Sequence, residues 1–407
     1  MNKDETRIDA WRVQPSTNMN NGRRRQFGIG FVCVAVLVVL AAGDVLAGDG
    51  HALLRITFAE HDKQRRAVEG RIVVEAQDGG ILLQGRDGRL WNVTPEMLVK
   101  REALGKPFRP LTPDELAAQL SAEFGPGFEI VKTRHYVICT SAGKTYGRWC
   151  GALFERLMSS FQTHWRSRAL QLHEPELPLS AIVFADSKQF AKFASQDADP
   201  SLASATGYYS IKTNRMILQD LTAGPNSRPA VTPADITRKV AASPFNVATV
   251  VHEATHQIAF NCGLHTRYAD NPLWLTEGMA MYFETPDLRS RNGWRTVGKV
   301  NRRRLKRFRE SVRSRRRNDS LETLLSGAER FGNSETSLDA YAEAWALTYF
   351  LIKTRRKQYI EYLRRLSKKP VLIWDDPQKR VEEFQAVFGE DLGKLQRDFL
   401  RYIRRQR

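Results

Sequence analysis

The sequence VVHEATHQI, at residues 250–258, decides how the C-terminal half of the chain folds. A Ser-Pro pair before it and a glycine after it are typical helix start and stop signals, so we expect one helix here. On that helix His252 and His256 lie one turn apart on the same face, where two imidazoles can reach one metal ion. Glu253 lies about 100° further round the helix. It therefore flanks the ion without binding it, where a base that takes a proton from water is needed.

A catalytic zinc site has three protein ligands, so a third ligand must come from elsewhere. Residues 273–283 read LWLTEGMAMYF and predict a second helix. Glu277 is the one acidic residue in this apolar run, and burying a carboxylate is costly unless it is paired or binds a metal. We therefore expect Glu277 to be the third ligand. Glu284, on the same face two turns later, is the reserve candidate.

These two stretches resemble the zinc helix and the ligand helix of gluzincin metallopeptidases, especially those of the aminopeptidase N branch. The resemblance covers roughly residues 180–365. It implies that His252, His256 and Glu277 bind one zinc ion, and that Glu253 acts as general base and then general acid in peptide-bond hydrolysis. The chain also resembles an uncharacterised family of exported bacterial proteins in the same peptidase MA-like superfamily, which carries a similar YAxxWAL stretch.

Two further features follow from the gluzincin resemblance. Tyr341 resembles the tyrosine that aminopeptidase-type members place downstream of the ligand helix, which implies a role beside the developing oxyanion. A core aromatic on a helix is the alternative. The hairpin expected at 207–218 occupies the place of the strand that pairs with an extended peptide, with a purely structural hairpin as the alternative. The Gly-x-Met-Glu-Asn segment that binds a free amino terminus in aminopeptidases is absent upstream of His252, so exopeptidase action is not implied.

The rest of the chain predicts an α+β fold. Short apolar runs separated by Asp-Gly pairs predict a small antiparallel β module within residues 48–105, followed by a proline-containing linker at 105–113. The α/β half of the peptidase domain would span 106–234 and the zinc-binding and helical half 235–407. In the α/β half we expect helices near 113–124 and 144–165, strands near 128–140 and 179–184, and the hairpin.

The first residues look like a targeting segment rather than part of the fold. Three arginines at 23–25 precede the uncharged run 27–42, and the small residues around Ala47 fit a signal-peptidase site. We expect residues 1–47 to be a signal peptide, with a membrane anchor formed by 27–47 as the alternative. The protein would then work in the periplasm, in the cell envelope or outside the cell.

The formal net charge of +18 is concentrated in one segment. Residues 299–317 contain eleven Lys or Arg and one acid. Because arginines would surround this helix, we expect little packing and a solvated surface, with attraction to an anionic envelope component as the alternative. Nucleic acid is not an expected partner, since no binding motif or interleaved aromatics accompany the charge. The expected partner is a peptide or protein substrate.

Three cysteines follow the targeting segment, namely Cys139, Cys150 and Cys262. A Cys139–Cys150 disulfide and three buried free thiols are both compatible with the spacing. The leading functional hypothesis is an exported zinc metallopeptidase. The alternative is an envelope-anchored binding or scaffold protein whose zinc site is catalytically silent.

Overall fold

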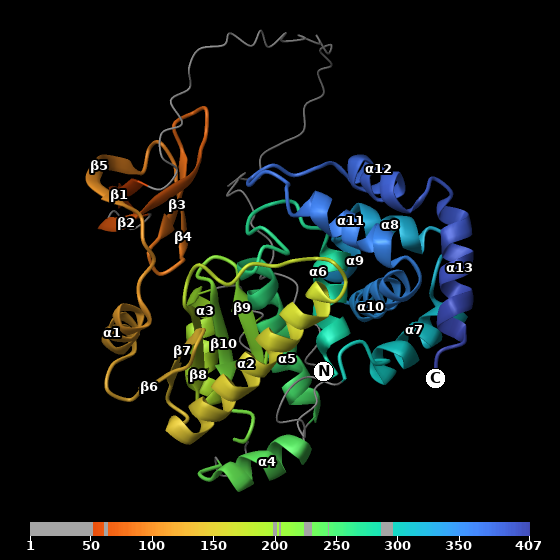
Figure 1. Cartoon of the computed structure of the whole chain (residues 1–407), viewed down its shortest axis with the longest axis horizontal. Coiled ribbons are helices and arrows are strands. Elements are labelled where there is room, and N and C mark those ends of the chain that lie inside the picture. Colours follow the sequence, from red (N-terminus) through yellow and green to blue (C-terminus); the bar gives the residue numbers. More distant parts are fainter. Residues whose placement is uncertain are drawn as a thin grey trace, which may run out of the picture.

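The structure is a computed structural model that describes residues 52–60, 64–197, 202, 205–223, 230–242, 244–285 and 296–407. An antiparallel sheet is followed by a mixed sheet and then by a mainly helical half, which confirms the α+β class (Figure 1). The targeting segment expected at 1–47 lies outside the described residues. Among the described residues, no helix has the length and apolar character needed to cross a membrane.

The N-terminal sheet has five antiparallel strands in the order β4-β3-β2-β1-β5. Its strands are β1 (Ala52–Ala59), β2 (Arg65–Glu75), β3 (Ile81–Gly85), β4 (Leu90–Val93) and β5 (Leu98–Pro107). The two Asp-Gly turns join β2 to β3 and β3 to β4 as expected, with Gly79 and Gly88 at positive φ. We expected the linker to begin at residue 105, but it begins later, because β5 pairs with β1 as far as Pro107.

The mixed sheet has the strand order β6-β7-β8-β10-β9. Its strands are β6 (Glu129–Lys132), β7 (Tyr136–Thr140), β8 (Leu179–Phe184), β9 (Gly207–Ser210) and β10 (Arg215–Gln219). The three inner strands are parallel, whereas the edge strands β6 and β9 are antiparallel to their neighbours. The single strand expected at 128–140 is wrong. The chain reverses at 133–135, where the N–H of Thr133 donates to the carbonyl of Tyr136.

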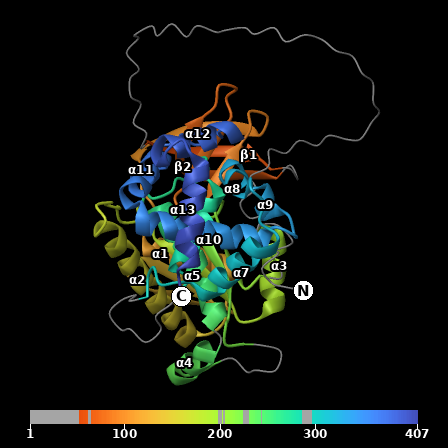
Figure 2. The same cartoon turned by 90° about the vertical axis from the view of Figure 1, so that its right-hand side faces the viewer.

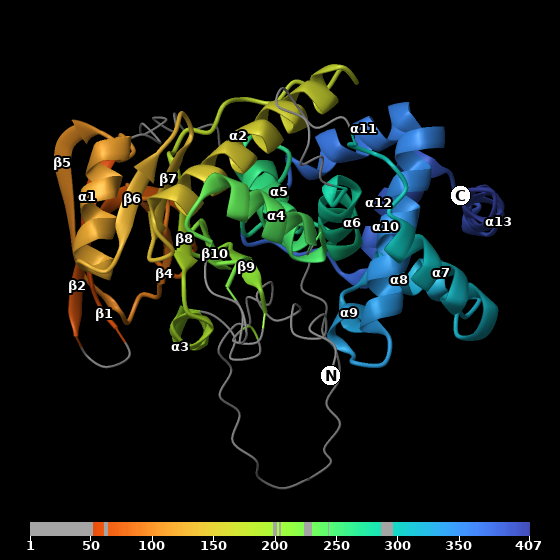
Figure 3. The ribbon, with the colours of Figure 1, turned by 90° about the horizontal axis from the view of Figure 1, so that it is seen from below.

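Helices cover both faces of the mixed sheet. They are α1 (Pro113–Phe124), α2 (Lys144–Arg166), α3 (Ser187–Asp197), α4 (Pro233–Ala242) and α5 (Pro244–Asn261). The larger core lies between the sheet and the helices α2, α4 and α5, whereas α1 and α3 pack on the opposite face. Figure 3 shows the strands between α2 and α3. The expected helices and the hairpin are confirmed, and α3 was not expected.

The C-terminal half is built around α10, which is buried along almost its whole length. The helices are α6 (Leu273–Phe283), α7 (Arg302–Ser314), α8 (Ser320–Ser326), α9 (Glu329–Gly332), α10 (Ser337–Thr354), α11 (Arg356–Leu366), α12 (Pro377–Phe388) and α13 (Leu392–Arg404). Among these, α6, α7, α9, α11 and α13 pack against α10. Figure 2 views the molecule from this helical end. On its other side α6 packs against α5, so α6 joins the sheet half to the helical half.

The basic segment corrects our expectation, because α7 packs through an apolar face. Leu305, Phe308 and Ser311 recur at every third position and are buried. Arginines of the segment bind acids that are distant in the sequence, in the pairs Arg304–Glu284, Arg307–Asp339, Arg315–Asp339 and Arg316–Glu343. These acids lie at the end of α6 and on α10, so local sequence could not reveal the pairs. Attraction to an anionic partner stays a prediction for exposed side chains such as Arg302 and Lys306.

Cys139, Cys150 and Cys262 are buried free thiols, which is one of the two alternatives that their spacing left open. Cys139 points into the core on the α1 side of the mixed sheet, whereas Cys150 packs in the core on the α2 side. The sheet therefore separates the two residues that could have formed a disulfide. Burial raises the pKa of the Cys139 thiol to about 12, so it stays protonated and unreactive.

The crossing of α6 and α10 depends on one glycine. A Cβ added at Gly278 would lie 2.1 Å from Oγ1 of Thr348 and 2.6 Å from the carbonyl oxygen of Ala344. Backbone cannot give way at that distance, so α6 would have to move. We expect Gly278→Ala to lower the free energy of unfolding by about 1 to 3 kcal/mol, as measured by urea denaturation. Gly127→Ala is the matched control, because an added Cβ there meets nothing within 4 Å.

Candidate metal centre

Two helices that start and end as expected carry the candidate metal ligands. α5 begins at Pro244 and ends at Asn261, and Gly263 follows at positive φ (81°), a conformation that closes a helix at little cost for glycine. α6 spans Leu273–Phe283, the same residues that the sequence predicted. Because α5 packs against both the sheet and α6, the two helices face each other from opposite halves of the molecule.

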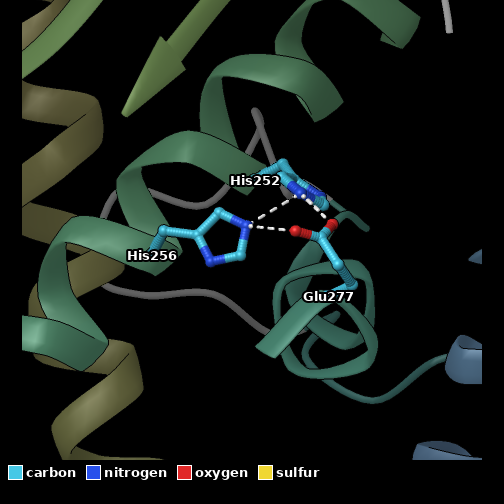
Figure 4. Close-up of side chains that lie close together, drawn as sticks. All are labelled: His252, His256 and Glu277. Carbon is cyan, nitrogen blue, oxygen red and sulfur yellow. Dashed lines mark hydrogen bonds and ion pairs between the residues drawn. The ribbon is translucent and has the colours of Figure 1, made fainter. Parts of the chain in front are cut away.

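His252, His256 and Glu277 meet between these helices (Figure 4). Nε2 of His252 lies 3.0 Å from Nε2 of His256 and 3.0 Å from Oε2 of Glu277. Nε2 of His256 lies 3.4 Å from Oε1 of Glu277. Ligands placed about 2 Å from a tetrahedral zinc ion lie about 3.3 Å from one another, so this spacing suits one ion. The three side chains could therefore hold a metal, as the sequence predicted.

Burial makes this group costly without a bound cation. The exposed fractions of His252, His256 and Glu277 are 1%, 2% and 1%. Burial by itself raises the pKa of Glu277, but the adjacent His256 and His252 together outweigh burial and hold that pKa well below its usual range. The carboxylate is therefore ionised in the site, as a metal ligand must be.

Glu284 lies behind His252 and is not one of the three converging ligands. Its Oε1 lies 2.8 Å from Nδ1 of His252, the ring nitrogen opposite the one that faces Glu277. Asn301 donates to Oε2 of Glu284 at 3.0 Å, and Arg304 donates to Oε1 at 3.2 Å. A carboxylate in this position fixes the orientation of the ring and makes a ligating histidine more basic. The reserve ligand of the sequence analysis is therefore a positioning residue.

Glu284→Gln should weaken binding of a metal ion at this group by about 10- to 100-fold, because the amide keeps the size of the side chain but loses the charge that supports His252. Competition with a chromophoric chelator measures the affinity. Glu335→Gln, a change of the same chemistry at an exposed position, should leave the affinity unchanged. Equal affinities in Glu284→Gln and the parent would contradict this role.

Glu253 is held beside the ligands by the edge of the mixed sheet. It is 4% exposed, and its Oε2 accepts the N–H of Tyr209 at 3.0 Å. Tyr209 lies in β9, the edge strand, and pairs with Met216 of β10. The N–H of Tyr209 points away from β10 and toward α5. The hairpin expected at 207–218 is confirmed, and its first strand, β9, is the edge strand that contacts Glu253. Peptide pairing along this edge stays a prediction.

A buried amide network ties the hairpin to α5. Asn214 and Asn261 exchange side-chain hydrogen bonds of 2.9 and 2.8 Å. The Tyr209 hydroxyl donates to Oδ1 of Asn214, and Nε2 of Gln257 donates to the Asn214 carbonyl. Sequence reasoning missed this network, although a signal exists. Glu253, Gln257 and Asn261 follow one another at every fourth position and so form a polar stripe along one side of α5.

Tyr341 lies on α10, which packs along α6. Its ring contacts that of Phe331, and the guanidinium of Arg304 lies 5.8 Å from the ring centroid. Since Arg304 also binds Glu284, Tyr341 belongs to the buried surroundings of His252. A core role is consistent with these contacts, and a catalytic role for the hydroxyl stays a prediction.

Comparison with known families gives one match to this region. A family model described as "Protein of unknown function (DUF1570)" matches residues 246–372. The matched part contains most of α5, all of α6 and α10, and hence the three candidate ligands, Glu253 and Tyr341. The N-terminal sheet and the mixed sheet lie outside the match. No curated protein matches the chain.

Proposed function

We propose that this chain is an exported zinc metallopeptidase that hydrolyses peptide bonds. One observation carries the proposal: next to a buried group of two imidazoles and a carboxylate, the same helix carries a second buried carboxylate, Glu253, which directly follows the candidate ligand His252 in the chain. A purely structural zinc site is closed by its ligands and has no use for a base at its side. Hydrolysis needs such a base, because a proton must leave the attacking water.

The donor set favours zinc over other common metals. Two imidazole nitrogens and one carboxylate oxygen suit zinc, whereas calcium and magnesium prefer sites made of oxygen. His252, His256 and Glu277 would hold the ion, and Glu284 would keep the His252 ring oriented. When bound, zinc polarises the carbonyl under attack and makes water a better nucleophile.

Residues of the chain would handle the proton and position the substrate. The Glu253 carboxylate takes a proton from water and returns it to the leaving amine. The N–H of Tyr209 holds one oxygen of that carboxylate, which limits its rotation. A peptide pairing with β9 would use the backbone groups of this edge strand other than the N–H of Tyr209, which binds Glu253. Tyr341 remains the candidate donor to the developing oxyanion.

The test combines metal analysis with cleavage of a mixed peptide library. Purified protein should contain one zinc ion per chain, and chelation should abolish cleavage that added zinc then restores. Stoichiometric zinc with no cleavage of any peptide would contradict the peptidase proposal and support the scaffold alternative. Amino-terminal sequencing of the exported form tests cleavage after Ala47 separately.

A further inference from the structure

A cavity of about 260 Å³ lies next to the candidate metal centre. Its apolar lining comes from distant parts of the chain, namely Ile211, Phe260, Tyr268, Leu273, Leu325 and Trp374. An apolar cavity of about 150 Å³ is large enough for benzene, so this one has room for a phenyl or indole ring. The lining residues are neither metal ligands nor the expected base.

The cavity continues the faces of the two ligand helices. Phe260 lies four residues after His256 on α5, and Leu273 lies four residues before Glu277 on α6. Side chains four residues apart on a helix have Cβ atoms about 5 to 6 Å apart. Ile211 directly follows the edge strand β9, whose Tyr209 binds Glu253. The cavity is therefore one helical turn from the metal ligands and at the end of the edge strand.

The charges in the cavity wall are neutralised within the protein. Asp270 is buried and pairs with Arg380 at 2.7 Å and with Lys369 at 3.3 Å. Arg380 also donates to the carbonyl of Ser326. A charged ligand group would have to compete with these contacts, whereas an apolar group would not. The lining therefore favours a neutral occupant with a large apolar part, and the buried Oδ1 of Asn271, which has no hydrogen-bond partner among the described residues, can accept one hydrogen bond from it.

Trp374 forms the rim of the cavity. Its exposed fraction is 50%, and it follows Ile373, which is 57% exposed. The loop that carries them is fixed by a bridge between Ala269 and Val371 and by the N–H of Leu372, which donates to the carbonyl of Tyr268 at 2.7 Å. A half-exposed tryptophan on a fixed loop can bury more apolar surface when a ligand fills the cavity.

We propose that this cavity is a subsite for a large apolar side chain of the peptide substrate, and that Trp374 determines that preference. The inference rests on the proposed peptidase function. It adds a substrate class, namely peptides with an aromatic or leucine-sized residue close to the cleaved bond. A peptide lying along β9 with its reactive carbonyl at the metal would place a neighbouring side chain beside Ile211.

Binding of peptides tests the subsite without relying on cleavage. The full-length Glu253→Gln protein is titrated with two fluorescein-labelled peptides that differ only in one central residue, Phe or Gly, and anisotropy is measured. We expect the Phe peptide to bind about ten-fold tighter or more, as burial of a phenyl ring implies. Trp374→Ala in this background should remove most of that difference, and Trp374→Phe should restore it.

Ile373→Ala is the matched control, because Ile373 is exposed on the same loop and does not line the cavity. It should leave the Phe preference unchanged. Should Trp374→Ala not fold, Ile211→Trp fills the cavity instead and should weaken binding of the Phe peptide alone.

Three outcomes separate the subsite from the peptidase proposal. Equal binding of both peptides by the Glu253→Gln protein, no binding of either, or an undiminished preference when Trp374→Ala is added to a folded protein overturns the subsite. Cleavage together with any of these results leaves the peptidase proposal standing. A Trp374-dependent preference in a zinc-loaded protein that cleaves nothing supports the subsite and contradicts the peptidase.

Discussion

Replacing Glu253 with glutamine should reduce zinc-dependent peptide cleavage by about 10²- to 10⁴-fold, while one zinc ion per chain is retained. Glutamine has the size of glutamate, and its amide oxygen can still accept the N–H of Tyr209. It cannot take a proton from water, so only the chemical step should suffer. The turnover number kcat should fall far more than the Michaelis constant KM changes.

Metal content and folding must be measured on the same Glu253→Gln preparation. The zinc-to-protein ratio and the circular dichroism spectrum should match those of the parent. Glu335→Gln, the same chemical change at an exposed position, is the matched control and should leave kcat unchanged. A kcat equal to that of the parent in Glu253→Gln would rule out the proposed base.

Replacing Glu277 with alanine should remove zinc from the protein, with an affinity loss greater than about 100-fold. Loss of an outer partner of a ligand already weakens binding by about 10- to 100-fold, and Glu277 is expected to be a direct ligand. The variant also lacks the one carboxylate that bridges both imidazoles. At zinc concentrations that give the parent full activity, cleavage by Glu277→Ala should be too slow to detect.

Thermal unfolding reports this loss independently of activity. A ligand that binds only the folded state stabilises it by about 2.7 kcal/mol at a concentration of 100 Kd, so zinc should raise the Tm of the parent. The same zinc concentration should leave the Tm of Glu277→Ala unchanged. Glu335→Gln serves as the exposed control. A zinc-dependent rise in Tm of equal size in Glu277→Ala would exclude Glu277 as a ligand.

The sequence predicted the ligand group because its signals are local. His252 and His256 sit on one helix whose start and stop residues are unambiguous, and the bounds of α6 follow from an apolar run. The lone acid in that run, Glu277, had to be paired or bound to a metal when buried. Both predictions used only the number of residues per helical turn and the free-energy cost of burying a charged group.

The parts that sequence reasoning missed depend on partners distant in the chain. Glu284 follows Glu277 by two helical turns, so the sequence alone could not tell which of the two binds a metal. The packing of α5 and α7 around Glu284 places it against His252 and Arg304 instead. The sequence of α7 did not reveal its buried side, because arginines dominate it. Their acidic partners, such as Asp339, lie on α10, far away in the sequence. The strand break at 133–135 follows from pairing, which periodicity does not report.

The amide network between the hairpin and α5 has a consequence for how the molecule opens. An edge strand normally frays before the centre of a sheet, and its backbone amides exchange with deuterium first. Here Asn214 at the hairpin turn and Tyr209 within β9 are bonded to Asn261 and Glu253 on α5. The amides of β9 should therefore exchange at the slow rate of the helix, so that strand and helix unfold as one cooperative unit.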